Sequence, residues 1–229
     1  MAMEKELKTM KNMERAAVIL VILVVATLTY TQVMVNKVAA MASSGEFAQQ
    51  AGSAGNEAAS SQTSVIPTGM PRLYGEELGV SYDDISPYDQ RKADEAIKRL
   101  AYLDNYIELA PEELERYIKI GMQISCEYCC GAEAIIFRNG QAACGCAHSF
   151  AMRGVAKFLL REHPNDFTDD EILEELGKWK TLFFPGQMQG KAAALEQNGI
   201  EFNYINLASN RYRGIEQGLS AGGGMVGGC

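Results

Sequence analysis

Six side chains that can bind soft metals or exchange disulfides lie together in one short segment of this chain, CEYCCGAEAIIFRNGQAACGCAH. They are Cys126, Cys129, Cys130, Cys144, Cys146 and His148. Because the whole chain has only six cysteines and two histidines, nearly all of its soft-ligand capacity is concentrated here. Thiolates and imidazole are the ligands that Zn²⁺, Cu(I) and iron–sulfur clusters prefer. We therefore predict a metal site built from these six residues.

The spacing of the ligands divides the segment into two halves. Cys126 and Cys129 have the spacing of a zinc knuckle, in which two thiolates converge on one ion from a tight turn. The second half begins at Cys144 and lies at the start of a predicted helix, whose free N–H groups stabilise a thiolate. Between the halves, Asn139-Gly140 predicts a β-hairpin with a type I′ turn and positive φ at both residues. The hairpin should bring the two halves to one site.

Several ligand sets and chemistries are compatible with this arrangement. A structural zinc site takes four ligands, and the first choice is Cys126, Cys129, Cys144 and Cys146, with Cys130 and His148 as alternates. Zinc is the preferred ion, with Cu(I) or a four-cysteine iron–sulfur cluster as alternatives. Two structural disulfides running between the halves, or active thiol chemistry, are the competing interpretations.

The last cysteine of the chain has a different setting. Cys229 follows a glycine-rich segment, and residues 218–229 are expected to form a flexible tail. A thiol on such a tether could reach back to the cluster to pass on metal or reduce a disulfide, unless it is simply the end of a disordered tail. No motif of a serine hydrolase, zinc protease or phosphate-binding loop is found, so the sequence favours a binding role over an enzyme.

The N-terminal part predicts a membrane anchor. Ala16–Val35 is an uncharged apolar stretch of about the 20 residues needed to cross hydrocarbon. Four basic residues precede it, and only Lys37 follows it before Arg72. The positive-inside rule then places residues 1–15 in the cytoplasm, a transmembrane helix at 16–36 and the rest outside the cell membrane. A signal peptide cleaved after Ala42 is the alternative.

The remaining chain is expected to be a flexible linker over residues 37–70 and a mainly helical domain over 71–217. The linker is rich in Ala, Ser, Gly and Gln, which bury too little apolar surface to order it. Apolar periodicity and capping signals predict helices at about 87–108, from Pro111, from Ala147 to about Arg161, from the Thr168 capping box to about Phe183, and at about 187–198. The predicted fold is thus mainly α, with one β-hairpin at the Cys/His site.

Composition excludes one class of partner. The formal charge is −8, whereas a nucleic-acid-binding surface is basic. We therefore expect no nucleic acid as a partner.

The order of knuckle, hairpin and helix start resembles a treble-clef zinc finger. The runs CEYCCG and ACGCAHSFAMRG, followed by EELGKWKTLFFPGQM, resemble uncharacterised membrane-anchored cysteine-rich proteins of archaea, and Cys144-Gly145-Cys146 with His148 is similar to exported bacterial C-x-C-x-C proteins. These resemblances imply metal binding and no particular activity.

Three functions follow as expectations. The first is an extracytoplasmic metal-binding protein anchored by Ala16–Val35, with a structural or metal-relay role. The second is a thiol–disulfide oxidoreductase that uses Cys126 with Cys129 or Cys144 with Cys146. The third is a disulfide-stabilised surface protein.

Overall fold

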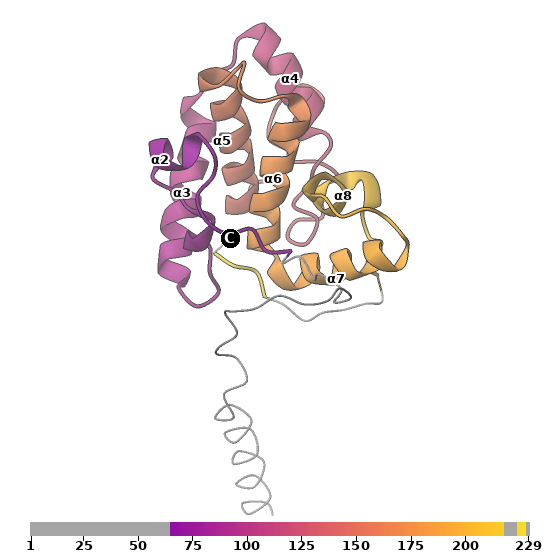
Figure 1. Cartoon of the computed structure of the whole chain (residues 1–229). Coiled ribbons are helices and arrows are strands. Elements are labelled where there is room, and N and C mark those ends of the chain that lie inside the picture. The colour runs from indigo at the N-terminus through magenta and orange to yellow at the C-terminus, as the bar shows by residue number, and fades with distance from the viewer. Residues whose placement is uncertain (1–64, 218–223, 228–229) are drawn as a thin grey trace, which may run out of the picture. The chain divides into compact units, whose positions relative to one another are not determined.

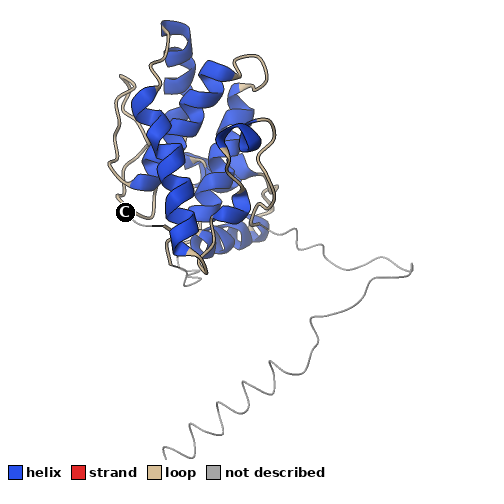
Figure 2. Ribbon diagram, turned by 90° about the vertical axis from the view of Figure 1, so that its left-hand side faces the viewer, coloured by secondary structure: helices blue, strands red, loops and turns tan. Residues whose placement is uncertain are grey.

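The computed structural model of this chain describes residues 65–217 and 224–227. The predicted membrane anchor, most of the predicted linker and Cys229 lie outside these residues. Within the described part the protein is mainly helical and contains no strand (Figure 2). None of the described helices is long and apolar enough to cross a membrane.

Seven α-helices and two 3₁₀-helices are found among the described residues. In chain order they are α2 (Tyr74–Leu78), η1 (Tyr82–Asp84), α3 (Gln90–Tyr106), α4 (Pro111–Gly121), α5 (Ala147–Glu162), α6 (Asp169–Phe183), α7 (Pro185–Gln197), α8 (Tyr204–Ala208) and η2 (Asn210–Tyr212).

Helix α5 is the centre of the fold. It packs against α3, α4 and α6, and Figure 1 shows it running between α3 and α6 while α7 crosses their lower end. The close approach of α3 requires Gly154, because a Cβ atom there would collide with the carbonyl oxygen of Leu100. The N-terminal end of α5 is also buried, and it carries Cys146 as the N-cap and His148 in the first turn.

Local capping decides where the predicted helices begin. The capping box of α6 is present as predicted: the Thr168 hydroxyl accepts from the Glu171 N–H, and the Glu171 carboxylate accepts from the Thr168 N–H. Helix α4 begins at Pro111 as predicted. Helix α3 begins at Gln90 and not at Pro87, because the Asp89 carboxylate accepts from the Lys92 N–H and provides the cap.

The expected hairpin is reduced to a turn with one antiparallel bridge, between Ile136 and Ala142. The Gly140 N–H donates to the Phe137 carbonyl and the Phe137 N–H donates to the Gln141 carbonyl. Gly140 has a φ of 80° and Asn139 is not in the positive-φ region, so the turn is not of type I′. A three-residue loop closed by a left-handed glycine accounts for this pattern.

Both ends of the described chain contact the helical body. The carbonyl of Val65 accepts from the Tyr204 hydroxyl at 3.2 Å, and Pro67 is buried, although both were predicted in the linker. At the other end Val226, predicted in a flexible tail, is buried, and its N–H donates to the Phe183 carbonyl at 2.9 Å. The packed part of this chain therefore extends beyond residues 71–217.

Candidate metal centre

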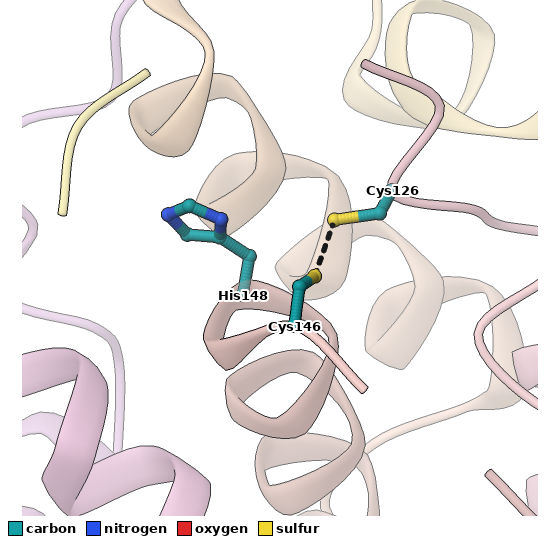
Figure 3. A group of neighbouring side chains, drawn as sticks. All are labelled: Cys126, Cys146 and His148. Carbon is teal, nitrogen blue, oxygen red and sulfur yellow. Dashed lines mark hydrogen bonds between the residues drawn. The ribbon is translucent and has the colours of Figure 1, made fainter. Parts of the chain in front are cut away.

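The structure brings together three of the six predicted ligands: Cys126, Cys146 and His148. Their ligand atoms all lie within 4.8 Å of one another, and the two Sγ atoms are 3.2 Å apart (Figure 3). All three residues are buried, with exposed fractions of 0, 8 and 0 per cent. This group could hold a metal ion.

The backbone that carries Cys126 is held from two sides. The Ile135 N–H donates to the Ile124 carbonyl at 2.9 Å, which connects the segment to the Asn139-Gly140 turn. Ile124 also forms an antiparallel bridge with Ser209, and the Ser125 hydroxyl donates to the Asn210 side chain at 2.8 Å. These contacts position Cys126 between segments that are far apart in the sequence.

Cys146 lies at the N-terminus of α5 and caps it. The Ser149 N–H donates to the Cys146 Sγ at 3.3 Å. The Cys126 Sγ lies 3.2 Å from the same sulfur. This contact, with help from His148 and the Ser149 N–H, lowers the pKa of Cys146 far below that of an ordinary thiol. The pKa of Cys126 is raised, first by its hydrogen bond to Cys146 and then by burial.

His148 is oriented by the C-terminal segment. Its Nε2 lies 2.8 Å from the Val226 carbonyl oxygen, which can only accept, so Nε2 carries the proton. The ring lies against Phe183 and Phe184, with centroid distances of 4.7 and 5.2 Å. Figure 3 shows the other ring nitrogen on the side of the two sulfurs. A carbonyl that fixes the tautomer of a histidine in this way is typical of metal ligands.

The other three cysteines take different positions. Cys130 and Cys144 are joined by a disulfide, and disulfide sulfurs offer no thiolate to a metal. Cys129 is exposed and lies outside both the disulfide and the three-residue group. The first-choice set of four ligands is therefore not assembled in this structure. His148 joins Cys126 and Cys146 instead, because the N-terminal end of α5 directs Cys146 and His148 inward.

A buried charge cluster next to the site was not predicted. Glu127, with a φ of 50°, accepts from Lys180 Nζ at 2.9 Å, from Lys191 Nζ at 3.2 Å and from the Gly214 N–H at 3.1 Å. Both lysines have exposed fractions of 0 per cent. Burial lowers the pKa of Lys180 to about 8 despite the neighbouring carboxylate. The only sequence signal for this charge cluster is Lys180, which lies within the apolar stretch around Trp179. Most residues of α6 in that stretch are buried, and Lys180 is buried with them.

A second buried charge supports the disulfide side of the site. The Arg153 guanidinium, 1 per cent exposed, forms an ion pair with Asp104 at 2.7 Å. It also donates to the Cys144 carbonyl at 2.9 Å and to the Ser149 hydroxyl at 2.8 Å. Arg153 thus connects α3, the first turn of α5 and the disulfide loop. Its role depends on long-range packing, and no local motif indicates it.

Comparison with known proteins adds no constraint. The chain matches no protein-family model, no curated protein and no solved structure at a significant level of similarity. The resemblance to anchored archaeal proteins stays a prediction. Fold and site together define a small, mainly helical, cysteine-rich protein with a buried Cys/His group.

Proposed function

We propose that this protein binds one soft or borderline metal ion through Cys126, Cys146 and His148. The observation that carries the proposal is the hydrogen bond from His148 Nε2 to the Val226 carbonyl, together with the position of the two sulfurs on the opposite side of the ring. A buried imidazole whose second ring nitrogen lies beside two cysteine sulfurs is the donor set of a metal site.

The donor set narrows the choice of ion. Zn²⁺ with three protein ligands keeps a fourth position for water or another small ligand, and thiolates also select Cu(I). A four-cysteine iron–sulfur cluster is less well supported, because two of the five cysteines in the described residues form a disulfide. Zinc remains our first choice and Cu(I) the second.

Elemental analysis of the chain, purified without oxygen, tests this proposal. We expect about one equivalent of zinc or copper per chain. Cys126→Ser, Cys146→Ser and His148→Ala should each lose most of the metal. His163→Ala, which removes a histidine paired with Glu77 and Asp166, should retain it.

The exposed Cys129 provides a second control. Cys129→Ser removes one thiol from the same segment without touching the three-residue group, so we expect full metal content. Metal loss as large as in Cys126→Ser would contradict the three-residue site in favour of the four-cysteine prediction. Absence of metal from the wild-type protein would contradict metal binding altogether.

The setting of the site is part of the proposal. The apolar stretch Ala16–Val35, with its preceding basic residues, supports an anchored protein whose folded part lies outside the cytoplasm. There the domain would hold the metal in a structural role or pass it on at the membrane face. Labelling of the exposed Cys129 in intact cells by a thiol reagent that does not cross membranes checks this location, and labelling only after lysis would contradict it.

A further inference from the structure

Four sulfur atoms follow one another from the surface into the core. Cys130 is exposed and is bonded to the buried Cys144. The Sγ of Cys144 lies 3.5 Å from the Sγ of Cys146, which lies 3.2 Å from the Sγ of Cys126. A disulfide is thus in contact with one thiol of a second, reduced pair.

From this geometry we infer a second activity, an internal thiol–disulfide exchange between the two cysteine pairs. In the first step Cys146 attacks the Sγ of Cys144, a Cys144–Cys146 bond forms, and Cys130 leaves as a thiolate. In the second step Cys126 attacks Cys146, a Cys126–Cys146 bond forms, and Cys144 leaves. One disulfide is broken and one is formed, and the protons that the Cys126/Cys146 pair carries pass to Cys130 and Cys144.

The packing of the four residues favours each step. Exchange proceeds by attack of a thiolate on a disulfide sulfur through a mixed disulfide, so it requires the attacking sulfur to touch the sulfur attacked. Both sulfur–sulfur contacts are already made. The Ser149 N–H holds the Cys146 sulfur, and the Arg153 guanidinium holds the Cys144 backbone by donating to the Cys144 carbonyl. Neither cysteine therefore has to move far before the exchange.

The exchange has a consequence at each end of the sulfur series. At the exposed end it releases the Cys130 thiol beside Cys129, where an external thiol or disulfide has access. At the buried end it joins Cys126 to Cys146 and removes two metal ligands. The inference depends on the sulfur contacts alone and not on the proposed metal binding.

Disulfide mapping of the full chain tests the exchange directly. The protein is prepared with one disulfide per chain, kept in a metal chelator without added thiol, acid-quenched, alkylated and analysed by peptide mass spectrometry. We expect both Cys130–Cys144 and Cys126–Cys146 forms, in proportions independent of protein concentration. Finding only Cys130–Cys144 after long incubation would overturn the inference.

Two matched variants test the order of the steps. In Cys126→Ser the exchange should stop at the Cys144–Cys146 bond, so that a maleimide labels Cys130. In Cys146→Ser the attacking sulfur is missing, and Cys130 should stay bonded to Cys144 and unlabelled. Equal labelling of Cys130 in both variants would overturn the proposed route.

The result is separable from that of the metal experiment. The exchange is measured in chelator and metal content without it, so either finding can fail while the other holds. Circular dichroism of the two serine variants identifies a loss of folding, and the wild-type mapping needs no variant.

Discussion

The Nε2 of His148 donates a hydrogen bond to the carbonyl oxygen of Val226 at 2.8 Å, across 78 positions of the sequence. The Val226 N–H in turn donates to the Phe183 carbonyl in α6. The C-terminal segment is therefore fixed through both backbone groups of one residue, Val226, and it sets the orientation of a candidate ligand on α5.

This contact predicts that the C-terminal segment contributes to metal affinity. A chain ending at Gln217 should bind metal about 10- to 100-fold more weakly, because His148 loses the acceptor that fixes its tautomer and ring orientation. A chain ending at Gly227 keeps Val226 but lacks Cys229, and its affinity should equal that of the full chain. Competition with a chromophoric chelator measures both. Equal affinities of the two truncated chains would contradict the role of Val226.

The ion pair between Arg153 and Asp104 should dominate the stability of the site region. Asp104→Asn leaves a buried guanidinium without its counter-charge, and we expect a loss of about 3–5 kcal/mol in the free energy of unfolding. Glu95→Gln breaks the exposed pair with Arg91 and should cause no measurable change. Denaturant titration of both variants tests this. A similar small effect in both would show that the buried pair is dispensable.

Close packing of α3 on α5 predicts different outcomes for alanine substitutions at two glycines near the site. An alanine at a helix interior normally stabilises by up to about 1 kcal/mol, but at Gly154 its Cβ meets the Leu100 carbonyl. Separation of the helices should cost about 2 kcal/mol or more and outweigh that gain. Gly145 is exposed with no atom near its missing Cβ, so Gly145→Ala should leave the melting temperature unchanged. A stabilised Gly154→Ala protein would be inconsistent with the described helix contact.

Lys180 predicts a specific pH dependence of stability. Its pKa is lowered to about 8 from an ordinary value of 10.5, so between these values the unfolded chain binds more protons than the folded one. The stability of the wild type relative to Lys180→Met should therefore rise with pH from about 8 to 10, with a slope of about 1 kcal/mol per pH unit. Below pH 8 the difference should be flat.

Urea unfolding of the two metal-free proteins at pH 7, 8, 9 and 10 measures this slope. The exposed Lys98, changed to Met, is the control for the loss of one positive charge. A difference that falls as pH rises would have the opposite sign and would contradict a buried, charged Lys180.

Most of the helix positions predicted from the sequence depend on short-range signals. Three of these signals act within a few residues, and all three are present in the structure. They are the capping box at Thr168, Pro111 at the start of α4, and the apolar stripe of α6 formed by Ile172, Leu176, Trp179 and Phe183. The cluster of cysteines was visible for the same reason, since its members are close in sequence. The predicted start of α3 at about residue 87 was wrong, because Asp89 caps the helix and it begins at Gln90.

Which of those cysteines share a site depended on tertiary packing. Pairing of Cys130 with Cys144, and of Cys126 with Cys146, is set by how the loop after α4 lies against the first turn of α5, and several pairings fit the same spacing. Contacts between distant segments, such as His148 with Val226 and Glu127 with Lys180 and Lys191, leave no local pattern. The sequence by itself indicates that the cysteines and His148 are concentrated near the start of α5. The packing of α5 against its neighbours decides which of these residues come into contact.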